Sequence, residues 1–439
     1  MDEVTVGTIG IFLLFASIMA GVNVMVALGV VGSVGLVILS GVTGATSTLS
    51  SIFFSTTASF HFSVVPMFLL MGYFAMKAGL GEDLFEAAVK WLGRLPGGLA
   101  VATTGAAGAF GAASGSSVGT ALVFTKLALP EMIRHGYDRR LASASIAISG
   151  TLAALIPPSA LMVVYCLLTD TSVGQLLMAG VIPGILFTFL ICLATVIAVL
   201  LNPKLAPRSE QRFTWREKLK AIRLVGPLVL IVGSIIVGLY FGVFTPTEAG
   251  AIGVIFIFLM ATWRQRGLKG IQLGNVLIDT VQTTCMVFGI IISALIFSRF
   301  LAFSGLTELI GELLTTLDVS PWMVVLIVTA IYIVLGMIMD APAMLAVSLP
   351  VTHPVMMDLG FDPVWFGVYV VVLAELGAIT PPVGMNCFVV KGAAGNLVSL
   401  EDVFRGITPY WIITLGMLAI LYVFPEIALY LPNTMIMSD

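Results

Sequence analysis

The chain has 439 residues, of which 59% are hydrophobic and 10% are charged, and its formal net charge is −3. A mean hydropathy of +1.12 is too high for a water-soluble fold. The sequence contains neither a P-loop nor an HExxH motif, which argues against ATP-driven pumping and familiar hydrolytic chemistry. Many apolar stretches approach the roughly 20 residues that cross a bilayer as a helix. The composition therefore predicts an all-α polytopic protein in a lipid bilayer, and we expect no nucleic-acid partner.

The basic residues separate two kinds of connection between the apolar stretches. Lysine and arginine gather at 77–94, 134–140, 204–223, 264–269 and 405, whereas 43–60, 168–174, 241–247, 304–320, 351–363 and 431–439 contain none. Because basic connections stay in the cytoplasm, the first set is predicted to be cytoplasmic and the second external. Both termini then lie on the external, periplasmic side.

This charge map predicts the following membrane spans in chain order: 4–20, 24–42, 61–77, 141–168, 174–202, 224–240, 246–263, 281–300, 364–395 and 407–430. Three amphipathic stretches, 45–60, 83–94 and 305–318, are expected to lie along the membrane interface.

Two further apolar stretches, 97–129 and 321–350, do not fit single crossings. Basic residues flank the first on both sides, and one crossing would put them on opposite sides of the membrane. A re-entrant hairpin keeps both flanks in the cytoplasm, with arms too short to span at 1.5 Å per residue. The second stretch has no basic flank, which fits a hairpin entered from outside.

A shift of 224 residues brings the two halves of the chain into register. "LAALIPPSA" (152–160) then aligns with "LGAITPPVG" (376–384), and "PEMIRHGYD" (130–138) with "PVMMDLGFD" (354–362). The repeats are 1–202 and 224–439, joined by a basic cytoplasmic linker at 203–223. The charge map gives them opposite orientations, and inverted repeats with paired broken helices are typical of secondary transporters.

Each repeat contains a proline pair inside a span: Pro157–Pro158 in 141–168, and Pro381–Pro382 in 364–395. A proline removes a donor and disturbs the carbonyl four residues earlier. The pairs are therefore predicted to free the carbonyls of Ala153, Ala154, Gly377 and Ala378. Free carbonyls suit a hard cation such as Na⁺, and the half-helix that follows presents a positive N-terminus to an anion.

The hairpin tips are expected to face these breaks. The first tip, "ASGSSVG" (113–119), is rich in hydroxyls and glycine, and the second, "GMIMDAPAM" (336–344), contains Asp340. In the repeat, Asp340 lies opposite Ser116. Intramembrane carboxylates such as Asp340 and Glu375 are costly unless they are functional or paired. Asp340 is the stronger ligand candidate, and the alternative for Glu375 is a structural hydrogen-bonding group behind the break.

With these motifs the whole chain resembles the large membrane subunit (DctM type) of the tripartite ATP-independent periplasmic (TRAP) transporters. The most specific segments are "ASGSSVGT" (113–120), "SGTLAALIPPS" (149–159), "GMIMDAPAMLAVSLP" (336–350) and "ELGAITPPVGMNCFV" (375–389). The resemblance implies Na⁺-coupled import of a small organic anion, a carboxylate or sialic acid, across the bacterial inner membrane. It also implies an elevator motion of a transport domain against a scaffold, a periplasmic binding protein and a small four-helix membrane subunit on a separate chain.

The resemblance further implies two cation sites and a substrate site. The first cation site would use Ser114, Gly115 and Ser116 with the backbone of Thr151, Ala153 and Leu155. The second would use Gly336, Met337 and Asp340 with Gly377 and Thr380. Substrate would lie between the tips, near Ser116, Ser159, Asp340 and Asn386.

Other classes of protein remain as alternatives at this point. A membrane scaffold without transport would not need paired tips, and an intramembrane enzyme would need a nucleophile–base or metal constellation, which the sequence does not show. Among transporters, the alternative is a stand-alone anion or dicarboxylate symporter of the same broad superfamily, with protons as a possible coupling ion. The sequence does not select the transported anion.

Overall fold

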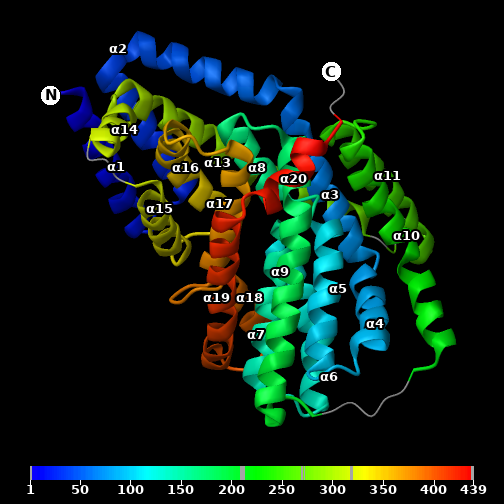
Figure 1. Cartoon of the computed structure of the whole chain (residues 1–439). Coiled ribbons are helices and arrows are strands. Elements are labelled where there is room, and N and C mark those ends of the chain that lie inside the picture. The colour runs from blue at the N-terminus through cyan, green and yellow to red at the C-terminus, as the bar shows by residue number, and fades with distance from the viewer. Residues whose placement is uncertain (1, 208–212, 268–269, 271, 317–319, 437–439) are drawn as a thin grey trace.

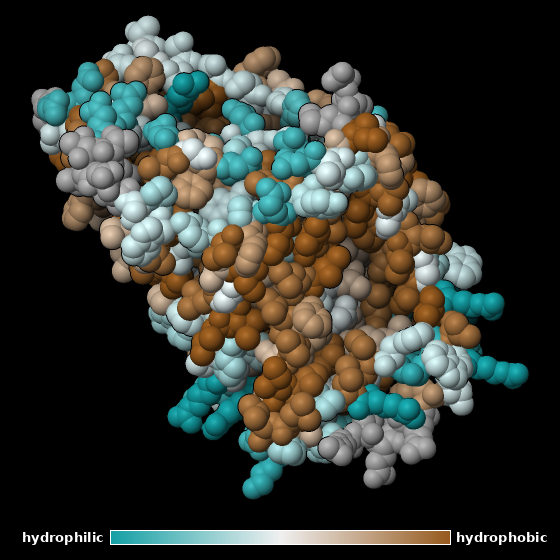
Figure 2. Space-filling model, viewed as in Figure 1, coloured by the Kyte–Doolittle hydropathy of each residue, from teal (hydrophilic) through white to brown (hydrophobic). Residues whose placement is uncertain are grey.

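The computed structural model describes residues 2–207, 213–267, 270, 272–316 and 320–436, which form helices and short connections without a strand. Seven helical segments of this described part are long and apolar enough to cross a membrane: α2 (Val24–Ala58), η1 with α3 (Phe60–Lys77), α9 (Val173–Leu201), α10 (Trp215–Tyr240), α11 (Pro246–Arg264), α13 (Leu273–Phe303) and α19 (Leu400–Val423). Figure 2 shows an apolar surface across the middle of one face, with hydrophilic residues toward both ends. The prediction of an all-α multi-pass membrane protein is confirmed.

The second of these segments consists of η1 (Phe60–Ser63) and α3 (Val64–Lys77). The other elements of the first half are α1 (Glu3–Met19), α4 (Leu80–Leu92), α5 (Gly98–Ser114), α6 (Ser117–Arg134), α7 (Arg139–Thr151), η2 (Leu152–Ala154), α8 (Ala160–Thr169) and η3 (Pro203–Leu205). In the second half they are α14 (Leu306–Thr316), α15 (Pro321–Gly336), α16 (Ala341–Asp358), α17 (Pro363–Gly377), α18 (Met385–Ala394) and α20 (Glu426–Thr434). The series α3 to α9 and the series α13 to α19 have the same order of elements; the inverted orientation of the two remains a prediction.

The predicted hairpins are both present as two helices joined by a tip, and both are longer than expected. Helix α6 continues to Arg134, beyond the expected end at 129, and α16 continues to Asp358, beyond 350. Pro130, Pro350 and Pro354 lie inside these helices. The helices tolerate them because each proline removes a single backbone hydrogen bond and neighbouring groups can compensate. In the first hairpin, the amide of Leu99 donates to the hydroxyl of Tyr137 at 3.0 Å, so the start of α5 lies beside the end of α6.

The structure adds local detail at two predicted boundaries. Within the linker predicted at 203–223, a helix begins at Trp215, because Thr214 and Glu217 form a capping box that starts α10; residues 208–212 of the linker lie outside the described part. The predicted span 24–42 and the interfacial stretch 45–60 are two helices that meet at a kink within α2, as the prediction divided them. Gly41 has φ 71° and ψ 173°, a conformation open to glycine, and beyond it the helix runs across one end of the molecule (Figure 1).

Helix α13 is packed on both sides by the first half of the chain. A Cβ atom at Gly32 of α2 would lie 2.9 Å from the Cα of Phe297, so the two helices touch through their backbones. On the α3 side, the hydroxyls of Tyr73 and Thr283 are 2.8 Å apart. These contacts form a frame beside the two hairpins (Figure 1).

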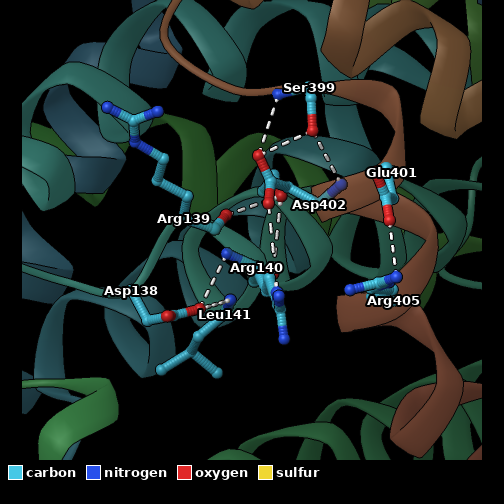
Figure 3. Close-up of polar contacts among 9 residues, drawn as sticks. Asp138, Arg139, Arg140, Leu141, Ser399, Glu401, Asp402 and Arg405 are labelled. Atoms are coloured by element: carbon cyan, nitrogen blue, oxygen red, sulfur yellow. Dashed lines mark hydrogen bonds and ion pairs between the residues drawn. The ribbon is translucent and has the colours of Figure 1, made fainter.

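The broken helix of the first half meets the last long helix where α7 and α19 begin. Figure 3 shows Asp138 accepting the amides of Arg140 and Leu141, and Asp402 held by Ser399. The side chain of Arg140 lies 3.9 Å from Asp402. This cluster aligns the starts of the two helices and holds α7, which leads into the first break, against α19.

Candidate cation and substrate site

The first hairpin tip lies against the first break. Gly115 has a left-handed backbone (φ 58°), and a Cβ atom there would lie 3.0 Å from the carbonyl oxygen of Pro158. Ser116 caps α6, with its hydroxyl accepting the amide of Gly119 at 3.1 Å. The hydroxyl of Ser114 lies 2.9 Å from that of Thr120. The tip is therefore a tight turn whose glycine lets two backbones meet.

The first break runs from the end of α7 to the start of α8. A Cβ atom on Gly111 of α5 would lie 2.6 Å from the Cα of Ala153, which puts the hairpin arm directly on the break. Ser159 caps α8 and donates its hydroxyl proton to the carbonyl of Ala154 at 2.6 Å. The hydroxyl of Thr151 donates to Ile148 at 2.6 Å, and the amide of Leu155 donates to Leu152 at 3.1 Å.

The second hairpin tip makes the same kind of contact with the second break. A Cβ atom on Gly336 would lie 2.6 Å from the Cα of Gly377, and one on Gly377 would lie 2.5 Å from the Cα of Gly336. The amide of Val383 donates to the carbonyl of Met337 at 3.3 Å. Asp340 caps α16 without a side-chain capping bond and is half-buried. Asp340 and Ser116 thus occupy the same position, the N-cap of the second hairpin helix.

Polar side chains near the second break are more deeply buried. The hydroxyl of Thr380 donates to the carbonyl of Leu376 at 2.5 Å and accepts the indole N–H of Trp411 at 2.9 Å. Asn386 is fully buried, and neither atom of its amide has a hydrogen-bond partner among the described residues. Sequence reasoning missed Trp411, because one tryptophan in an apolar helix carries no signal of its partner.

The prediction that the prolines free four carbonyls was wrong for three of them. The carbonyl of Ala154 accepts the Ser159 hydroxyl, that of Gly377 accepts the amide of Thr380 at 2.9 Å, and that of Ala378 accepts the amide of Asn386 at 2.9 Å. A tight turn at the end of α17 brings the amide of Thr380 to Gly377, and the residues that follow the prolines supply the other two donors. A carbonyl has two lone pairs, so each oxygen keeps one for a further ligand.

The two breaks differ in how far they are covered. Pro157 and Pro158 are buried, whereas Pro381 and Pro382 are exposed. Both Pro–Pro bonds are cis. The second break is therefore the more accessible of the two in this conformation.

Two cavities of 660 and 320 Å³ lie elsewhere: the larger adjoins η1 and the α10–α11 turn, and the smaller adjoins α4 and the α6–α7 turn. Tip residues line neither of them, and the pairing of Ser116, Ser159, Asp340 and Asn386 around one substrate remains a prediction. Ser159 and Asn386 are fully buried, whereas Ser116 and Asp340 are half-buried.

Comparison with known protein families shows to which family the chain belongs. The model of the "Tripartite ATP-independent periplasmic transporter, DctM component" family matches residues 11–427. The chain belongs to the DctM family. It is a transporter permease component and not an enzyme.

Relatives and one solved structure agree with this DctM assignment. The chain is 35% identical to the C4-dicarboxylate TRAP transporter large permease protein DctM of Pseudomonas aeruginosa, over 88% of this chain and 89% of that one. It is 29% identical to the sialic acid TRAP transporter large permease protein SiaM of Vibrio cholerae, over 85% and 87%. The YdaH transporter of Alcanivorax borkumensis has a similar fold, with a TM-score of 0.60 at 16% identity, over 89% and 90%.

Proposed function

We propose that this DctM-family chain imports a small organic anion across the bacterial inner membrane, driven by Na⁺. The C4-dicarboxylates are the first substrates to test, because the relative that is 35% identical is named for them. Both termini would face the periplasm, as the charge map predicts.

The pairing of each hairpin tip with a proline break supports this proposal. In both halves a glycine contact brings the tip backbone onto the break, Gly111 on Ala153 and Gly336 on Gly377. Carbonyls and hydroxyls that gather where two backbones meet form the oxygen-rich surroundings that Na⁺ prefers, and half-helix N-termini favour an anion. Asp340 adds a carboxylate at the second tip.

Two partners belong to the proposal. The family description is of a tripartite transporter in which DctM is one component. The other two would be a periplasmic protein that delivers the anion and a small four-helix membrane subunit. The frame formed by α2, α3 and α13 would serve as scaffold, and the hairpins with the broken helices would move against it as an elevator.

Uptake into proteoliposomes tests the proposal. The chain would be reconstituted with its small membrane subunit, and a labelled C4-dicarboxylate would be supplied with the cognate binding protein. We expect uptake only with an inward Na⁺ gradient and without nucleotide. Undiminished uptake when K⁺ replaces Na⁺ would contradict Na⁺ coupling, and dependence on an inward proton gradient would favour the proton-coupled symporter.

A further inference from the structure

The first turns of α10 carry a stripe of three cations, Arg216, Lys220 and Arg223, which we call the α10 stripe. Their spacing of four and then three residues places the side chains on the same side of the helix. All three are exposed, and none of the ion pairs found among the described residues includes them. Glu217, the acid of these turns, already accepts hydrogen bonds from the amide and the hydroxyl of Thr214. The stripe is therefore a surface of positive charge that α10 itself does not neutralise.

The same face of α10 becomes apolar farther along the helix. Leu230 lies seven residues beyond Arg223, an interval that returns close to the same side of a helix, and it is 73% exposed. At 1.5 Å per residue, the stripe is about 10 Å long and Leu230 lies about 10 Å beyond it. The headgroup layer of a bilayer is about 5–8 Å thick on each side, and each leaflet of hydrocarbon is about 15 Å thick. The face thus matches a phospholipid in the order of its parts and in their approximate size.

Contacts with the end of α4 hold the start of α10 in place. The ring centroids of Trp91 in α4 and Trp215 in α10 are 6.1 Å apart, and the ammonium of Lys218 lies 5.4 Å from each centroid, within the range of a cation–π interaction. The indole N–H of Trp91 also donates to the carbonyl of Lys218 at 3.3 Å. Trp215 nevertheless remains 71% exposed, as is common for tryptophan at a membrane interface. The direction in which the α10 stripe faces is therefore fixed by the packing of α10 on α4.

Membrane orientation alone does not explain the α10 stripe. The positive-inside rule requires basic residues at the cytoplasmic end of a helix, but it does not require them to lie on one face without acidic neighbours. At the starts of α7 and α19, Arg140 and Arg405 each lie beside a carboxylate, that of Asp402 and that of Glu401. Figure 2 shows hydrophilic side chains beside the apolar surface at the end of the molecule where α10 begins in Figure 1. The charge of the stripe therefore favours an anion from outside the chain.

We propose that the face of α10 from Arg216 to Leu230 binds an anionic phospholipid. The phosphate of the lipid contacts the α10 stripe, where the arginines can each donate two parallel N–H groups to its oxygens, and an acyl chain lies along Leu230. Helix α10 packs against α11, and α11 packs against α3, so the lipid binds to the part of the chain that would serve as scaffold. The proposal depends neither on Na⁺ coupling nor on the identity of the transported anion.

Native mass spectrometry of the purified full-length chain with added lipid tests this site. The chain would be titrated in detergent with phosphatidylglycerol, which is anionic, and with phosphatidylcholine, which is zwitterionic. The double variant Arg216→Gln with Arg223→Gln removes two charges of the α10 stripe. The matched control is Arg139→Gln with Arg405→Gln, which removes two exposed arginines from the starts of α7 and α19. We expect the unaltered chain and the control to prefer phosphatidylglycerol, and the stripe variant to bind it at least about tenfold more weakly with phosphatidylcholine binding unchanged.

Two further measurements complete the test. Without lipid, the stripe variant and the control should unfold at the same temperature in detergent, because all four arginines are exposed. In the unaltered chain, the preference for phosphatidylglycerol should fall as ionic strength rises, a result that needs no variant. Equal binding of the two lipids by the unaltered chain, or an equal loss in the control, would overturn the proposal. Inorganic phosphate that displaces the lipid would indicate a site for soluble anions, and displacement by the small membrane subunit would assign the face to that protein; either result would overturn the lipid assignment. The proposed transport function would stand in each case.

Discussion

Replacing Gly377 with alanine should separate the second tip from the second break. The added Cβ atom would lie 2.5 Å from the Cα of Gly336, 3.0 Å from its carbonyl carbon and 3.3 Å from its oxygen. Carbon atoms in contact normally stand about 3.5–4.0 Å apart, so the two helix ends would have to part by about 1 Å. All of the nearest atoms are backbone, so rotation of a side chain cannot relieve the clash. Such overpacking costs about 1–3 kcal/mol.

The expected result for Gly377→Ala has two parts. Thermal unfolding in detergent should shift to lower temperature, and the half-saturating Na⁺ concentration for uptake should rise at least about tenfold, which corresponds to ~1.4 kcal/mol of lost binding. Gly392→Ala is the matched control: Gly392 lies in α18, the half-helix after the same break, and nothing within 4 Å would meet its Cβ. Alanine there should stabilise the helix slightly. Equal unfolding temperatures and equal Na⁺ dependence in the two variants would refute the reasoning.

Three further predictions concern the tip, the membrane topology and the ion pair between α4 and α11. Asp340→Asn should lower uptake at limiting Na⁺ at least about tenfold and recover partly at high Na⁺; wild-type Na⁺ dependence at normal expression would remove Asp340 from the site. Cysteines introduced at Arg94 and Arg134 should both be labelled from the cytoplasm, because the start of α5 is tied to the end of α6 by Leu99 and Tyr137; labelling from opposite sides would contradict the hairpin. Asp83→Asn breaks an ion pair with Arg264 in which the side chains are only 10% and 26% exposed, and it should destabilise the fold by about 1–3 kcal/mol. Glu86→Gln, which breaks the more exposed pair with Lys90, should cost about 1 kcal/mol or less; equal melting temperatures for these two variants would contradict the difference in burial.

The features that the sequence predicted well are those with a strong local cause. Proline pairs interrupt helices wherever they occur, and both breaks lie where Pro157–Pro158 and Pro381–Pro382 predict them. The first tip was found in the same way, because its glycine and hydroxyl residues favour a tight turn. The repeat then related Ser116 to Asp340, and both cap the second helix of a hairpin.

What the sequence could not predict depends on contacts between distant segments. The bond between Trp411 and Thr380 joins α19 to the second break, and no spacing in the sequence relates the two residues. The carbonyls in the breaks were misjudged because the proline rule considers only the donor four residues later, whereas the observed donors are the amides of Thr380 and Asn386 and the hydroxyl of Ser159.

The part of α2 beyond the bend at Gly41 is held in place at both of its ends. The helix beyond it, residues 42–58, is about 25 Å long at 1.5 Å per residue. The segments at its two ends are held against one helix: α2 touches α13 through Gly32 and Phe297, and the chain after the arm meets α13 through Phe62 and Phe288, whose rings are 5.6 Å apart. A helix that is held at both ends has little freedom to move relative to α13. If the hairpins move as in the proposed elevator mechanism, the distance between a spectroscopic label on residues 42–58 and a second label on a hairpin would therefore report the movement of the hairpin, with little contribution from movement of the helix that carries the first label.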